Sequence, residues 1–287
     1  MNRLVDFVLQ QTRPLALPLL TYPGVALVGA TVREVVTNPA RQAASQIALH
    51  ERFHTAVLLT SMDLSAEVEA FGGEAAISDG EVPTVLHRLV ADRSEAERLN
   101  VPVPGAARTR VYLETARLLK QQAPQSLLLG GMIGPFSLAA RIYGVSDALE
   151  LTFTDPDLMR LLLEKSVAFL AAYATAFKEA GADGVIVAEP TAGLLSPRAL
   201  REFSSAWVRR IVERVDDERF TLVYHNCAAK LVHLDAVLDT GARILHFGAP
   251  MDLGAALGRA PAGVIVCGNL DPTNVFFRGR PAEIARE

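Results

Sequence analysis

Short apolar runs alternate with long amphipathic stretches along this chain, and this alternation is the feature that most constrains its fold. The runs are rich in leucine and β-branched residues and are apolar throughout, which is typical of parallel strands buried on both faces. Repeated strand–helix alternation predicts an α/β fold with right-handed crossovers. The predicted strands are Leu15–Leu20, Ala56–Thr60, Ser126–Leu129, Gly184–Ala188, Thr221–Tyr224, Ile244–Phe247 and Val264–Val266.

Two helices between these strands carry clear start signals. Asp155 followed by Pro156 is typical of an N-cap and first helical position, and the helix is expected to run to about Ala180, where Gly181 ends it. Ser196-Pro197 opens a second helix that is expected to extend to about Arg214. The polar stretch 79–103 is predicted to lie outside the wall formed by the strands and helices.

The length of 287 residues suits one TIM (β/α)8 barrel, which needs about 250 residues, so we expect a single barrel domain over 1–287. A closed barrel has eight strands, whereas the sequence predicts seven, and only about twenty residues follow the last. Either the pattern misses one strand, or this chain ends before its last βα unit. We expect the second, a truncated barrel.

Bulk properties narrow the class of protein. The net charge is −4, and the sequence has no stripe of lysines and arginines. Both observations argue against a nucleic-acid partner. No apolar leader or membrane-length apolar stretch is present, so we expect a cytoplasmic protein without a membrane partner. The two cysteines are expected to be free thiols, metal ligands or nucleophiles rather than a disulfide framework.

Polar side chains follow most of the predicted strands at the point where each strand ends. Active sites of barrel enzymes lie at the carboxyl ends of the strands, so these side chains are expected to share one site. They are Ser61, Asp63, the glycine-rich segment 131–134, Glu189, His225, Cys227, His246, Cys267, Asn269 and Asp271.

The triplet 225–227 is the leading metal-site candidate. In an extended segment, side chains two residues apart point to the same side, so His225 and Cys227 can face one point. Zinc binds such nitrogen and sulfur ligands at roughly 2.0–2.3 Å. The alternative is a buried histidine beside a small hydrophobic cysteine. The position at a strand end favours zinc.

Cys267 is the other thiol, and it also ends a predicted strand. It could complete a His-Cys-Cys zinc set with an open fourth position, or it could be an inert core thiol. The sequence does not separate these two interpretations.

Two carboxylates at strand ends are candidate catalytic residues. Asp63 is suited to substrate binding or proton handling, and equally to capping the predicted helix 65–71. Glu189 precedes Pro190, and capping explains it less well, which favours a role as a ligand, a general base or a support for a ligand. His246 lies inside a predicted strand and is interpreted as a core histidine.

Several segments resemble the uroporphyrinogen decarboxylase superfamily, and most closely its cobalamin-dependent methyltransferase branch, typified by methylcobalamin:coenzyme M methyltransferase. They are GGMIGPFSLAARIYG, EAGADGVIVAEPTAGLLSPRALREF, YHNC, GNLDP and the amino-terminal YPG and DLSAEVEAFGGE. The resemblance covers nearly the whole chain.

The resemblance implies a TIM barrel that binds a corrinoid carried by a partner protein. It also implies a zinc ion, held here by His225 and Cys227, that activates a small acceptor thiol to take a methyl group from methylcobalamin. Gly134, Asn269 and Asp271 are predicted to contact the corrinoid. Barrels of this superfamily often pair, which makes a homodimer an expectation.

Two departures from the family pattern matter. The arginine-rich segment with which the decarboxylases grip substrate carboxylates is replaced here by LTYPGV, although Asp63 matches their catalytic aspartate. The third zinc ligand of the methyltransferases falls past the end of this chain, so either it is missing or Cys267 substitutes. The alternatives are a decarboxylase-like enzyme acting on a tetrapyrrole or smaller acid, and a non-catalytic corrinoid-binding protein.

Overall fold

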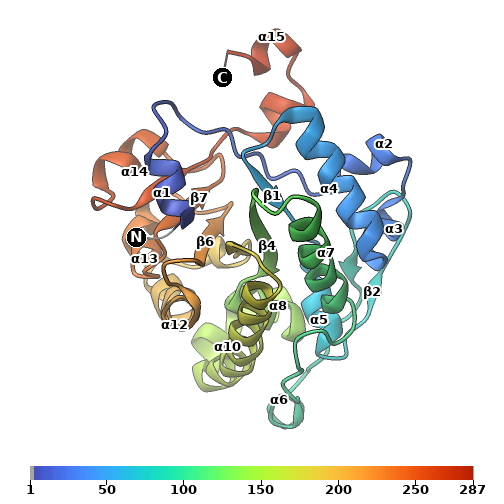
Figure 1. Cartoon of the computed structure of the whole chain (residues 1–287). Coiled ribbons are helices and arrows are strands. Elements are labelled where there is room, and N and C mark those ends of the chain that lie inside the picture. The colour runs from blue at the N-terminus through green and yellow to red at the C-terminus, as the bar shows by residue number, and fades with distance from the viewer. Residues whose placement is uncertain (1–2, 287) are drawn as a thin grey trace.

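A parallel six-stranded sheet forms the centre of the computed structural model, which describes residues 3–286 (Figure 1). The strands are β1 (Val57–Leu59), β4 (Leu127–Ile133), β5 (Gly184–Ala188), β6 (Thr221–Asn226), β7 (Ile244–Phe247) and β8 (Ile265–Cys267). They pair in that order, so each strand lies beside the next one in this series. Six of the seven predicted strands are thereby confirmed, together with the α/β class.

The predicted strand Leu15–Leu20 is wrong, because this segment has no regular secondary structure. Pro18 lies in its middle and lacks the N–H that a strand donates to its neighbour. The segment is apolar for another reason: Leu17 and Leu19 pack against the cluster of side chains on the inner face of the sheet.

Alternate residues of the strands divide between an inner and an outer apolar cluster. The inner cluster is completed by α1 (Arg3–Leu9), whose Leu4 and Val5 are almost fully buried in it. Every second residue of a strand points toward this inner cluster. These side chains are Val57, Leu59, Leu127, Leu129, Ile186, Val223, Ile244, Ile265 and Cys267.

The side chains between them point outward and pack against a layer of helices around the sheet (Figure 1). The longest is α10 (Pro156–Glu179), whose Asp155 N-cap accepts from the Leu158 N–H, as predicted. The other helices that follow or flank the strands are α4 (Pro39–Phe53), α5 (Ala66–Ala70), α7 (Thr109–Gln122), α8 (Pro135–Tyr143), α9 (Val145–Thr154), α13 (Leu234–Leu238) and α14 (Leu253–Arg259). α2 (Gly24–Val28) and α3 (Val32–Thr37) pack on α4, and α15 (Pro281–Ile284) lies apart from the sheet near the C-terminus (Figure 1).

The helix predicted to begin at Ser196-Pro197 is present but is not uniform. It starts as α11 (Pro197–Leu200), capped by the Ser196 hydroxyl, and continues as α12 (Ala206–Val215). Between them Arg201–Ser205 forms a π-helical turn. Such turns occur frequently beside functional sites.

The stretch 79–103 lies outside the main sheet, as predicted. It contributes β3 (Thr84–Val85), which pairs only with the short β2 (Ala75–Ala76), and the helix α6 (Arg93–Arg98). No helix within residues 3–286 is long and apolar enough to cross a membrane.

Candidate active site

The side chains predicted to share a site lie at one edge of the parallel sheet, where the strands have their carboxyl ends. Asp63 follows β1, Gly134 follows β4 and Glu189 follows β5. His225 lies near the end of β6 and Cys267 ends β8. The register continues across this edge, because the Glu189 N–H donates to the His225 carbonyl at 2.8 Å.

His225 and His246 form a pair within this edge. They are direct register partners on β6 and β7, and their Nδ1 atoms lie 2.7 Å apart. Burial lowers the pKa of His225 to about 4, with a further contribution from His246, and burial also lowers the pKa of His246. Both imidazoles are therefore neutral at pH 7, so one Nδ1–H donates to the other Nδ1. The interpretation of His246 as a histidine satisfied within the core missed this pairing.

Cys227 lies immediately after β6, and the residue is exposed to solvent. Partial burial of the thiol raises its pKa. A bound metal ion would reverse this effect, because a coordinating thiol is deprotonated.

Cys267 occupies a different environment from Cys227. It is the register partner of His246 on β8, and its Sγ contacts the Leu245 carbonyl oxygen at 3.4 Å. Burial raises its pKa to about 12, so it is a neutral thiol at pH 7.

The donor chemistry of His225 and Cys227, one nitrogen and one sulfur, fits zinc. Within residues 3–286, however, no three His, Cys, Asp or Glu side chains come together in a group that could hold a metal ion. The structure thus does not gather His225, Cys227 and Cys267 into one ligand set, and their shared role stays a prediction.

Asp63 is fully engaged by neighbouring donors. Its Oδ1 accepts from the N–H groups of Ser65 and Ala66 and from the Ser65 hydroxyl. Asp63 thus satisfies the first N–H groups of α5, as a cap does, although the N-cap position itself is Ser65. Its Oδ2 accepts from Arg108 and Tyr112, each at 2.5 Å. Burial alone would raise the pKa of Asp63, but the Arg108 charge and these hydrogen bonds hold it below its usual range.

Arg108 and Tyr112 were not identified from the sequence, because they precede and begin α7 some 45 residues after Asp63. Arg108 also pairs with Glu69. Nearby Glu67 is buried, accepts from the Ile133 N–H at 3.0 Å, and has its pKa raised to about 7 by burial. A buried network of charged and polar groups thus lies behind the ends of β1 and β4.

Glu189 caps α8, contrary to the expectation that capping explains it poorly. Its carboxylate accepts from the N–H groups of Phe136 and Ser137 and from the hydroxyls of Ser137 and Ser204, at 2.6–3.1 Å. Burial raises its pKa, and these hydrogen bonds oppose the rise. Ser204 comes from the π-helical turn. The catalytic assignment of Glu189 stays a prediction.

The residues predicted to contact the corrinoid have structural partners. An added Cβ at Gly134 would lie 2.3 Å from the Glu189 side chain, so this glycine permits close approach. Asn269 donates to the Met251 carbonyl, and Asp271 accepts from the N–H groups that open the turn Pro272–Phe277. Their contact with a corrinoid stays a prediction.

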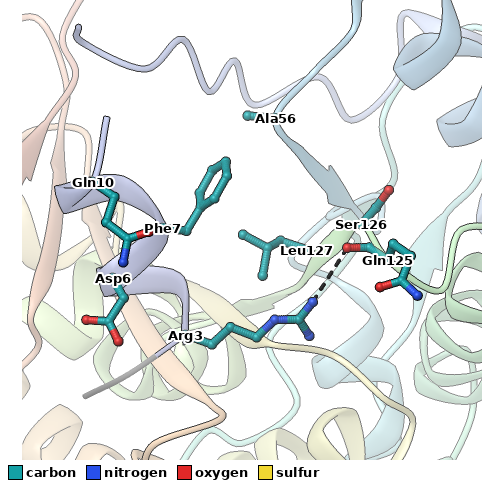
Figure 2. A pocket seen from close by; sticks show the side chains of 8 residues that line it. All are labelled: Arg3, Asp6, Phe7, Gln10, Ala56, Gln125, Ser126 and Leu127. Atoms are coloured by element: carbon teal, nitrogen blue, oxygen red, sulfur yellow. Dashed lines mark hydrogen bonds between the residues drawn. The ribbon is translucent and has the colours of Figure 1, made fainter. Parts of the chain in front are cut away.

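A cavity of about 400 Å³ lies at the opposite, amino end of the strands (Figure 2). Its lining comes from α1 and from the residues that precede or open β1 and β4, namely Arg3, Asp6, Phe7, Gln10, Ala56, Gln125, Ser126 and Leu127. In barrel enzymes this end serves stability rather than catalysis. The cavity is therefore separate from the candidate site.

Parallel strands wrapped by helices, with polar side chains at their carboxyl ends, define a β/α-barrel enzyme. A family model described as uroporphyrinogen decarboxylase (URO-D) matches residues 19–287. The chain belongs to the uroporphyrinogen decarboxylase family, as its sequence motifs indicated.

Relatives of this chain include enzymes of two kinds. It is 28% identical over 247 residues to the methylcobamide:CoM methyltransferase MtbA of Methanosarcina acetivorans, covering 83% of this chain and 72% of that one. It is 30% identical over 243 residues to the uroporphyrinogen decarboxylase of Burkholderia cenocepacia, covering 79% of this chain and 66% of that one. The prediction that the chain is an enzyme is confirmed, since its relatives of both kinds are enzymes.

The fold is similar to that of a solved methyltransferase from Methanosarcina mazei. The TM-score is 0.88 at 23% sequence identity, covering 96% of this chain and 84% of that one. This match confirms the predicted barrel class, in which the six described strands form a curled sheet with β1 and β8 at its edges.

Proposed function

We propose that this enzyme transfers a methyl group from a methylated corrinoid, carried by a partner protein, to a small thiol. The observation that carries the proposal is the placement of His225 and Cys227 at the end of β6, with Cys227 exposed to solvent. Similarity to MtbA, whose name describes methyl transfer from a methylcobamide to CoM, supports it.

The reaction balances without an added oxidant or reductant. The acceptor thiol loses its proton to solvent, and the thiolate sulfur forms a bond to the methyl carbon. The carbon–cobalt bond breaks, and both of its electrons remain on the cobalt of the donor. Zinc held by His225 and Cys227 would supply the chemistry for the first step, since it lowers the pKa of a bound thiol.

The chain's own residues prepare the site for this step. Glu189 ties the start of α8 to the end of β5 and so fixes the wall beside His225. Asp63 and Arg108 neutralise each other, which holds α5 and the loop after β1 in place. The corrinoid and the thiol would bind at this end of the strands, because active sites of barrel enzymes lie there.

Decarboxylation is the second candidate, because decarboxylases are among the relatives. The state of Asp63 argues against it. Both of its oxygens already accept hydrogen bonds, so the carboxylate is not free to bind a substrate. The LTYPGV segment also lacks arginines to neutralise a substrate with several carboxylates.

The test is a pair of assays on the purified protein with zinc added. With methylcobalamin and a small thiol such as 2-mercaptoethanesulfonate, we expect loss of the methylcobalamin absorbance and formation of the methyl thioether. Cys227→Ala is expected to abolish most of the activity, because the acceptor thiol would lose the metal that activates it. The exposed His87→Phe is the control and should leave the rate unchanged.

With uroporphyrinogen, no carbon dioxide release is expected. Steady release from uroporphyrinogen, together with no thioether from any thiol tested, would contradict the methyltransferase proposal and favour the decarboxylase. Binding of cobalamin without reaction in either assay would instead favour a non-catalytic corrinoid-binding protein.

A further inference from the structure

His225 and His246 form a close pair on neighbouring strands. Their Nδ1 atoms lie 2.7 Å apart, the ring centroids lie 4.7 Å apart, and the ring planes are inclined at 60°. Both side chains project from register partners on β6 and β7. The rings therefore meet nitrogen to nitrogen rather than by stacking.

The separation of these two nitrogens identifies the contact as a hydrogen bond rather than a pair of ligands to one metal. Two nitrogens that bind one tetrahedral zinc at about 2.05 Å each would lie about 3.3 Å apart. A distance of 2.7 Å is instead that of a short hydrogen bond between a ring N–H and a ring nitrogen. Since this contact uses Nδ1 of His225, a metal ligand role for His225 falls to Nε2.

Only one direction of this hydrogen bond is compatible with metal binding by His225. If His246 donates, the proton of neutral His225 resides on Nε2, and that nitrogen has no lone pair for a metal. If His225 donates from Nδ1, Nε2 carries the free lone pair. Metal-binding histidines almost always donate their other ring N–H to a neighbouring acceptor in this way.

We propose that His246 is a positioning residue that accepts the Nδ1–H of His225 and so keeps the Nε2 lone pair of His225 available to the metal. This inference rests on the proposed function, in which His225 is a ligand. An imidazole acceptor takes the place of the carboxylate or backbone carbonyl that commonly orients such histidines.

His246 has a register partner on each side. His246 lies between His225 and Cys267 in one register row across β6, β7 and β8. Cys267 directs its thiol to the Leu245 carbonyl and not to the histidine pair. The row therefore contains one hydrogen-bonded pair, His225 with His246, and Cys267 lies next to His246 without joining the pair.

The test combines two variants at position 246 with metal affinity as the readout. His246→Phe keeps a ring but removes the acceptor, whereas His246→Asn restores an acceptor oxygen near the position of Nδ1. Zinc affinity, measured by competition with a chromophoric chelator, is expected to fall about 10–100-fold in His246→Phe. It should recover most of that loss in His246→Asn, and His87→Phe is the control.

A second measurement does not depend on the stability of a variant. In metal-free wild-type protein, ¹⁵N chemical shifts of the histidine rings are expected to show His225 protonated at Nδ1 and unprotonated at Nε2. An Nε2-protonated His225 would overturn the proposal, and so would equal zinc affinity in wild type and folded His246→Phe.

Failure of this inference differs from failure of the proposed function. If wild-type protein binds no zinc at all, the proposed function fails. If wild-type protein binds zinc and His246→Phe binds it equally well, only the positioning role of His246 fails. Loss of a nitrogen ligand from the Co²⁺ ligand-field spectrum in both variants would mean that His246 binds the metal directly, which also overturns the positioning role.

Discussion

At the scale of single residues, the buried ion pair between Asp63 and Arg108 is expected to contribute substantially to stability. Asp63→Asn keeps an oxygen for the α5 cap but leaves the Arg108 guanidinium with less compensating charge in a buried site. Breaking a buried pair in this way costs about 3–5 kcal/mol in the free energy of unfolding. Urea unfolding measures this loss.

The matched control for Asp63 is Asp79→Asn, which breaks the exposed pair with Arg33. Exposed pairs contribute little, so this variant should unfold close to the wild-type midpoint. Equal midpoints for Asp63→Asn and Asp79→Asn would contradict the structural role assigned to Asp63.

The raised pKa of Glu67 makes the free energy of unfolding depend on pH. Burial raises its pKa to about 7 in the folded protein, above the ordinary value of 4.5, so between these values the folded state binds more protons than the unfolded state. The free energy of unfolding therefore decreases as pH rises from about 4.5 to 7. Glu67→Gln, which resembles the neutral acid, removes this contribution and should gain stability relative to wild type as pH rises through that window.

Urea midpoints of wild type and Glu67→Gln at pH 5 and pH 7.5 measure this difference. The Gln variant is compared with wild type at each pH, so contributions of other groups to the pH profile cancel. A midpoint difference that stays constant between the two pH values would show that Glu67 titrates near its ordinary range.

At the scale of elements, the start of α8 depends on Glu189. Glu189→Ala leaves two buried N–H groups and two hydroxyls without their acceptor, and each such group costs about 1–3 kcal/mol. We expect a loss of at least about 3 kcal/mol, with a smaller loss in Glu189→Gln, which keeps one oxygen. Asp252→Ala, which removes a cap with a single bond on α14, should cost about 1 kcal/mol in the same thermal or urea experiment.

The sequence predicts a helix or strand well where neighbouring residues determine it. It predicts poorly where the structure of a segment depends on distant parts of the chain. Continuous apolar runs identified six strands, and the Asp155-Pro156 pair located the start of α10. The run 15–20 has the same apolar composition, but it packs onto the inner face as an irregular segment that contains Pro18. Composition alone does not distinguish burial within a sheet from burial against one.

At the scale of the whole molecule, the site depends on long-range pairing that no local pattern encodes. The positions of Asp63, Glu189, His225 and Cys227 at strand ends follow from parallel topology, and this part was predicted. The pairing of His225 with His246 requires the register between β6 and β7, which packing sets. The partners of Asp63 come from α7, and the acceptor role of Glu189 requires α8 to begin beside β5.

The single-domain organisation over 1–287 and the homodimer stay predictions. The whole molecule contributes a rigid support for the carboxyl ends of the strands. Six parallel strands, closed on the inside by α1 and on the outside by a layer of helices, hold His225 and Cys227 at fixed positions (Figure 1). Sites on such elements are positioned more accurately than sites on loops.

Metal binding at His225 and Cys227 is the central claim, and a Co²⁺ titration of metal-free protein tests it most directly. Thiolate-to-cobalt charge-transfer absorbance should saturate at about one ion per chain, with the tetrahedral d–d bands typical of a zinc site. It should be lost in Cys227→Ala, while the d–d bands weaken and shift in His225→Ala. No charge-transfer band in wild type, or an unchanged band in folded Cys227→Ala, would contradict the account.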